Sequence, residues 1–73
     1  MDEHLRIRLS HLETDVRNNL SVLDEVKVGV SDNEREDSKQ YFTDKGFNVT
    51  TGAELLPPPF VKVSYYLLIK EKK

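Results

Sequence analysis

Apolar residues, with one amide among them, recur at alternating steps of four and three positions through the N-terminal part of the chain. Steps of this size place side chains along one face of a helix as a heptad seam. A lone helix cannot bury such a seam, so either a sheet of the same chain or a second copy of the helix is expected to cover it. The seam consists of Leu5, Leu9, Leu12, Val16, Asn19, Leu23, Val26 and Val30.

The first helix is expected over residues 2–23, where acidic residues at the start suit the positive end of the helix dipole. Its far end is ambiguous. Valines alternate with other residues between positions 26 and 30, which is a strand period, yet two of these valines also continue the seam. β-Branched residues and a glycine favour a short strand there. The alternative is one long helix that reaches Val30.

A second helix is expected over residues 32–45. Ser31 is followed three residues later by Glu34, which is the spacing of a capping box. Gly46 supplies the left-handed residue that commonly ends a helix. Most side chains between these signals are polar, so this helix is expected to lie at the surface.

Two stretches alternate apolar and polar residues as strands do, residues 47–51 and the longer run 60–70. One face of the longer strand is expected to join the core. The opposite face is mixed, and its apolar residues need a covering surface. The core face carries Val61, Val63, Tyr65, Leu67 and Ile69, and the mixed face carries Phe60, Tyr66 and Leu68.

Residues 52–59 are expected to form a rigid loop, because consecutive prolines hold their φ angles at about −65°. Leu55 and Leu56 in this loop are expected to plug the open end of the core. A strand of about eleven residues beside one of about five leaves the long strand partly unpaired, unless residues 26–30 or a second subunit pair with it. This overhang is a second indication of self-association.

Composition limits both stability and partners. A 73-residue domain buries only about 60% of the surface of its unfolded chain and commonly needs disulfides, a metal or oligomerisation. Cysteine is absent and only two histidines are present, which leaves oligomerisation. The net charge of −2 gives no basic field for general nucleic-acid binding. No signal-like or membrane-spanning stretch is found, so a cytoplasmic protein without membrane association is expected.

No motif carries recognisable catalytic chemistry, since the chain lacks a cysteine nucleophile, a glycine-rich phosphate loop and the usual zinc and serine-hydrolase patterns. His4, His11 and Asp15 share one stripe of the first helix. Two imidazoles and one exposed carboxylate make a weak metal site, so ordinary surface residues are the favoured interpretation. We therefore expect no enzymatic activity and no cofactor.

The predicted fold is α+β, a single small domain over residues 1–73 with a long N-terminal helix, a second capped helix and a small antiparallel sheet with a long C-terminal strand. The leading functional hypothesis is a non-enzymatic protein–protein interaction module. It would act as an inhibitor or adaptor by occupying a partner's surface, in the general manner of small phage or viral accessory proteins, and would itself be homo-oligomeric.

Two surfaces are candidates for these contacts. The partner-binding residues are predicted to be Phe60, Tyr66 and Leu68. The oligomer would use either that face or the seam, with Asn19 setting the register. One alternative is a structural subunit of a larger assembly, and another is a small-ligand site between subunits lined by Tyr65, Tyr66 and Arg6 or Arg8. The predicted seam interface comprises Leu5, Leu9, Leu12, Val16, Asn19 and Leu23.

Overall fold

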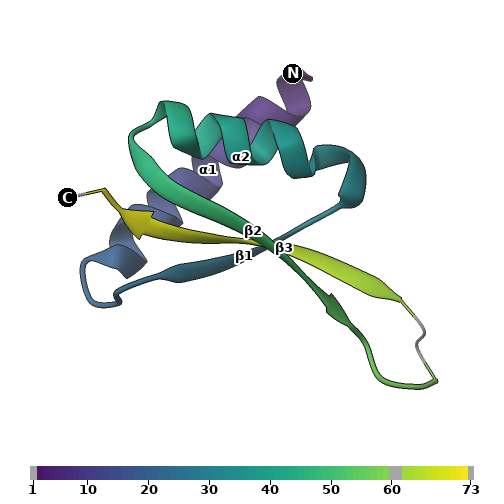
Figure 1. Ribbon diagram of the computed structural model, residues 1–73. Helices are drawn as coiled ribbons and strands as arrows, with labels where there is room; N and C mark the ends of the chain where they lie inside the picture. The colour runs from purple at the N-terminus through teal and green to yellow at the C-terminus, as the bar shows by residue number, and fades with distance from the viewer. Residues whose placement is uncertain (1, 60–61, 73) are drawn as a thin grey trace.

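The computed structural model describes residues 2–59 and 62–72, which form a layer of helices packed on a layer of strands (Figure 1). Within these residues, three strands make one antiparallel sheet in the order β1-β3-β2. Both helices contribute to one core on the same face of this sheet, and the predicted α+β fold is confirmed. In chain order the elements are α1 (Glu3–Leu20), β1 (Val26–Val30), the 3₁₀ turn η1 (Asp32–Glu34), α2 (Arg35–Asp44), β2 (Phe47–Leu55) and β3 (Val63–Glu71).

Helix α1 begins at a cap formed by Asp2, whose carboxylate accepts a hydrogen bond from the backbone N–H of His4 at 2.9 Å. The helix ends at Leu20, earlier than predicted, where the N–H of Leu23 turns back to the carbonyl of Asn19 at 2.8 Å. The alternating valines that follow form the strand β1. The short-strand interpretation is therefore confirmed, and the long-helix alternative is wrong.

Helix α2 does not begin with the predicted capping box. Within the described residues, the Ser31 side chain caps no backbone N–H, and its hydroxyl instead donates to the carboxylate of Glu34 at 2.7 Å. The turn η1 comes first, and the α-helix starts at Arg35. Glu34 also forms an ion pair with Arg8 of α1 at 2.5 Å, so it ties the two helices together. At the far end Gly46 has a φ of +93°, which confirms the predicted left-handed stop.

Strand β3 lies at the centre of the sheet and is paired on both sides. On one side β1 pairs with residues 65–69, and on the other β2 pairs along its whole length. Residues 26–30 therefore supply the pairing that was one of the two expected ways to avoid an overhang, and the argument for self-association that rested on an overhang no longer applies. β2 also extends to Leu55 instead of stopping at residue 51, because the strand-forming residues of β3 continue opposite it.

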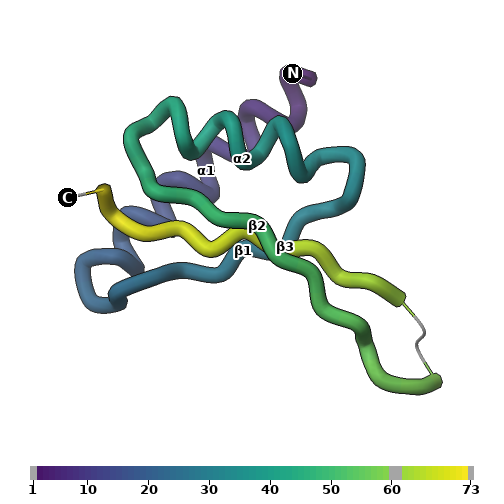
Figure 2. The backbone as a smooth tube through the Cα atoms, in the orientation of Figure 1, coloured from purple at the N-terminus to yellow at the C-terminus, as the bar shows by residue number. Residues whose placement is uncertain are grey.

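Beyond the helices, β2 and β3 continue as a two-stranded extension that we call the hairpin arm (residues 53–56 and 62–64; Figure 2). Leu55 in this arm is 73% exposed and Val63 is 45% exposed. The prediction that Leu55 plugs the open end of the core is therefore wrong. The arm carries apolar side chains past the end of the helical layer into solvent.

The predicted core face of β3 is buried only where the helices cover it. Leu67 and Ile69 are fully buried, and Tyr65 is half-buried. Val63 shares their face but lies out on the arm, and Val61 falls outside the described residues. The alternation is thus correct, and the length of the helices determines how much of this face becomes core.

The centre of the core joins all of the major elements. Phe42 of α2 packs edge-on against Phe47 of β2, with ring centroids 6.0 Å apart. Phe42 has no exposed surface, so it is an anchor of the packing. The buried hydrophobic residues are Leu5, Leu9, Val16, Leu20, Val28, Phe42, Phe47, Leu67 and Ile69.

Candidate functional site

The strongest candidate site is the face of the sheet opposite the helices, which we call the outer face. Among the described residues, no element lies over it (Figure 1). Because side chains alternate along a strand, its members follow from the pairing register. The outer face carries Lys27 and Gly29 from β1, Asn48, Thr50, Gly52 and Glu54 from β2, and Ser64, Tyr66, Leu68 and Lys70 from β3.

Tyr66 lies in the middle of the outer face between two glycines, since Gly29 and Gly52 are its partners in the neighbouring strands. A β-carbon built on Gly52 would lie 2.4 Å from the ring carbon Cζ of Tyr66. The ring therefore lies directly across the Gly52 backbone. The space beside Gly29 is open, because a β-carbon there would meet no atom within 4 Å.

Lys27 reaches over the Tyr66 ring from the β1 side. Its amino nitrogen lies 4.5 Å from the ring centroid and forms an ion pair with Glu54 on β2. The hydrogen bond with Glu54 raises the pKa of Lys27 above its ordinary value of 10.5. The ion pair joins the two edge strands across the central tyrosine, which leaves Tyr66 half-buried.

Leu68 continues the apolar strip along β3, with Lys27 and Thr50 as its cross-strand partners. It is also half-buried. Phe60, the third residue predicted for this site, lies outside the described residues. The structure thus brings Tyr66 and Leu68 together on an open face, with the charges of Lys27 and Glu54 beside them.

The seam of α1 is largely covered by the chain's own sheet. Leu5, Leu9 and Val16 are buried, whereas Leu12 is half-buried. In this conformation the buried residues cannot contact a second chain. Of the remaining predicted interface residues, Asn19 and Leu23 are exposed. The Asn19 amide donates to the carbonyl of Asp15 in its own helix at 2.9 Å.

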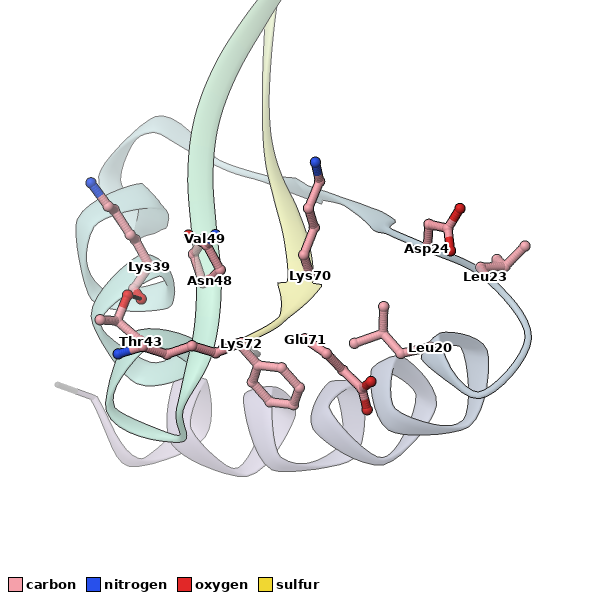
Figure 3. A pocket seen from close by; sticks show the side chains of 11 residues that line it. Leu20, Leu23, Asp24, Lys39, Thr43, Asn48, Val49, Lys70, Glu71 and Lys72 are labelled. Carbon is pink, nitrogen blue, oxygen red and sulfur yellow. Dashed lines mark hydrogen bonds between the residues drawn. The ribbon is translucent and has the colours of Figure 1, made fainter.

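A groove of about 920 Å³ lies where the ends of α1, β2 and β3 meet α2 (Figure 3). Lys39, Lys70 and Lys72 line it, but Figure 3 shows their amino groups pointing away from one another. All three lysines are exposed, and Lys70 forms an ion pair with Glu25 at 3.6 Å. Such flexible, divergent cations do not form a preorganised ligand site.

A second groove, of about 580 Å³, runs between the helices and the β1 side of the sheet. It includes Ser38 of α2, which is 1% exposed and whose hydroxyl has no hydrogen-bond partner among the described residues. Sequence reasoning missed this residue, because no motif distinguishes a buried serine from an exposed one in a polar helix. Tyr65 lines the groove, but Tyr66 lies on the opposite face, so the two tyrosines cannot line one ligand site within a single chain.

Neither a metal-binding group of three or more histidine and acidic side chains nor a helix long and apolar enough to cross a membrane occurs within residues 2–59 and 62–72. Comparison of the chain with protein families, with curated proteins and with solved structures gives no match. Its function must therefore be argued from its own surface.

Proposed function

We propose that this protein is a non-enzymatic protein–protein interaction module that acts by occupying a partner's surface with its outer face. The observation that supports this proposal is the contrast between the two faces of the sheet. Helices cover one face, while the other carries Tyr66 and Leu68 without a covering layer among the described residues. Tyrosine is favoured at interfaces because one end of its side chain is apolar and the other can form hydrogen bonds.

The size of the outer face suggests how such a contact is built. Strand spacing and rise per residue give it a projected area of about 400 Å². A standard interface buries about 800 Å² on each partner. The contact is therefore expected to extend along the hairpin arm, where Leu56 and Lys62 continue the even-numbered side beyond Glu54 and Ser64.

The chemistry of the outer face fits a protein partner better than a nucleic acid. Lys27 and Glu54 place opposite charges side by side over Tyr66, so the centre of the face has no net charge. A nucleic-acid surface needs clustered positive charge to replace counterions at the phosphates. We expect the partner to offer an apolar patch for Leu68 and polar groups for the Tyr66 hydroxyl and the ion pair.

The test compares three immobilised baits: the native chain, the double variant Tyr66→Ser/Leu68→Ser and the control Ile7→Ser. Ile7 is a matched control because it is apolar and 50% exposed on α1, far from the outer face. Proteins of the source cell that bind the native chain and the control, but not the double variant, are then purified and tested for direct binding. Circular dichroism checks that all three baits are folded. Equal capture by all three would refute the proposal.

A structural subunit of a larger assembly is the second candidate, favoured because β2, a nine-residue strand, lies at the edge of the sheet. It predicts polymers whose size grows with concentration, whereas an inhibitor or adaptor forms a complex of fixed size. Light scattering across about a hundredfold range of concentration separates the two.

A further inference from the structure

Within residues 2–59 and 62–72, the sheet ends on β1 at one edge and on β2 at the other, and these two edges are unequal. β1 is five residues long and carries Lys27, a residue type that discourages pairing between edges. β2 is nine residues long, and between Phe47 and Leu55 it contains no lysine, arginine or proline, with Glu54 as its one charged residue. Such a strand presents backbone groups that can pair with another strand.

The hydrogen-bonding pattern shows which groups β2 presents. The N–H of Leu56 donates to the carbonyl of Lys62 at 2.9 Å, which makes this a hydrogen-bonded pair in continuous register with the strands. Hydrogen-bonded and non-hydrogen-bonded pairs alternate along an antiparallel sheet. The backbone N–H and C=O groups of the even-numbered residues of β2 therefore bond to β3, and those of the odd-numbered residues point away from β3, toward the open edge. Among the described residues, no backbone bond uses the outward groups of Phe47, Val49, Thr51, Ala53 and Leu55.

We propose that β2 pairs antiparallel with β2 of a second copy about a twofold axis at Thr51, which makes a six-stranded sheet. This deepens the proposed function by naming one partner, a second copy, and the surface it uses. In this register, every residue of β2 whose backbone N–H and C=O point toward the open edge lies opposite another such residue. The pairs are Thr51 with Thr51, Val49 with Ala53 and Phe47 with Leu55 on the inner face, and Asn48 with Glu54 and Thr50 with Gly52 on the outer face.

The two halves of β2 are complementary to each other, which is why the occupant is a second copy. The half near Phe47 lies beside α2, since Lys39 and Thr43 border the same groove as Val49. The half near Leu55 projects beyond the helices (Figure 2). A twofold axis at the centre places the uncovered half of one copy against the covered half of the other.

This arrangement staggers the helices of the two copies along the strands, because the helix-covered half of each β2 meets the uncovered half of the other. The exposed Leu55 of each copy comes to lie beside the groove next to Phe47 of the other. No like charges lie opposite each other, because Glu54 meets Asn48. Both outer faces remain open on the same side of the joined sheet, so the dimer offers two binding faces in parallel.

Cysteine cross-linking tests the register directly, because the chain contains no cysteine. At a hydrogen-bonded pair the two Cα atoms of residue 51 are about 5.5 Å apart, within disulfide reach. Thr51→Cys is therefore expected to form a covalent dimer on mild oxidation. Ala53→Cys is the matched control, because its Cα atoms lie about 14 Å apart along the strands. No cross-link in Thr51→Cys, or equal cross-linking in both variants, would overturn the proposal.

A proline substitution tests the same edge without a covalent bond. Thr51→Pro removes an outward N–H and leaves the bonds to β3 intact. Gly29→Pro is the control, because the backbone N–H of residue 29 points away from β3 at the β1 edge. A β-carbon at residue 29 would also meet no neighbouring atom. Light scattering is expected to show dimers for the native chain and Gly29→Pro, and at least about a tenfold weaker dimer for Thr51→Pro, which loses two symmetry-related hydrogen bonds.

A native chain that is monomeric throughout, or a Thr51→Pro variant that dimerises normally, would overturn the proposal. The outer-face variant Tyr66→Ser/Leu68→Ser distinguishes a failure of the partner-binding proposal from a failure of the edge-pairing proposal. It is expected to dimerise normally while losing the foreign partner. A monomeric native chain that still binds that partner would reject edge pairing and retain the proposed function.

Discussion

Leu67 and Leu68 are adjacent residues of the same type in one strand, yet they lie in different environments. Leu67 faces the helices and has no exposed surface, whereas Leu68 is half-buried on the outer face. Burial of the first is built into the fold, whereas further burial of the second would come only from the partner that we propose. The difference teaches that α1 and α2 cover one face of the sheet and, among the described residues, leave an apolar strip on the other.

The largest expected effect is the difference in the free energy of unfolding between variants of these two leucines. Leu67→Ala leaves a cavity in the core and is expected to lower the free energy of unfolding by about 2–5 kcal/mol. A domain of 73 residues has a total of only about 4–11 kcal/mol, so much of the variant will be unfolded. Leu68→Ala is expected to cost about 1 kcal/mol or less. Urea denaturation followed by circular dichroism measures both, and equal losses would contradict the contrast between the faces.

The second effect concerns the fit of Tyr66 over Gly52. Gly52→Ala adds a methyl group where the ring lies, so we expect a loss of about 1 kcal/mol although alanine normally suits a strand better than glycine. In a Tyr66→Ala background the obstacle is gone, and the same substitution is expected to be neutral or stabilising. This reversal of sign, measured by a double-mutant cycle, is the diagnostic result. A loss of the same size in both backgrounds would show that the ring does not lie on Gly52.

The third effect depends on pH and belongs to the helical side of the molecule. Burial raises the pKa of Glu13, but hydrogen bonds from Tyr41 and Arg17 outweigh it and hold the pKa below 4.5. Because the folded state favours the carboxylate, its stabilisation is present above the unfolded pKa and is lost as the pH falls through the folded pKa. Glu13→Gln is expected to flatten the fall of Tm below about pH 5.

Tyr41→Phe provides an independent check of the same contact. It removes the hydrogen bond that donates to Glu13 at 2.8 Å and leaves the carboxylate in place. The fall of Tm at acid pH in Tyr41→Phe is therefore expected to be less steep than in the native chain and steeper than in Glu13→Gln. An acid response identical to that of the native chain in both variants would assign the pH dependence to other groups.

The smallest expected effect is that of the exposed ion pair on the outer face. Lys27→Gln removes the pair with Glu54, and the change in Tm should be smaller than that of any variant above. Salt should diminish the difference further, because the Debye length falls to about 3 Å at 1 M ionic strength. A large, salt-independent loss would mean that Lys27 fixes the sheet through its contact with the Tyr66 ring.

Much of the fold could be predicted from local patterns. Alternation identified both faces of β3, and Gly46 marked the end of α2. The sequence left open whether residues 26–30 form a strand or continue the first helix, because their valines fit both the strand period and the heptad pattern. Burial of Leu9 and Val16 in the chain's own core shows that the sheet covers the seam. Periodicity identifies an apolar face but does not say which surface will cover it.

Other features depended on partners that are distant in the sequence. The end of β2 contains Gly52, Ala53 and Glu54, residue types that are uncommon in strands, and only the register with β3 makes them a strand. The same register brings Gly52 and Lys27 to Tyr66. The sequence therefore indicated Tyr66 and Leu68 as exposed apolar residues, but could not show the glycine beneath the tyrosine or the ion pair above it.

The most direct test of the contrast between the faces is the solvent accessibility of the two leucines in the native chain. Leucine methyl signals are recorded by NMR with and without a soluble paramagnetic agent. We expect strong broadening of the Leu68 methyls and protection of those of Leu67. Edge pairing through β2 would leave this result unchanged, since it leaves the outer face open. Equal protection of Leu67 and Leu68 would mean that the outer face is covered, which would contradict the account.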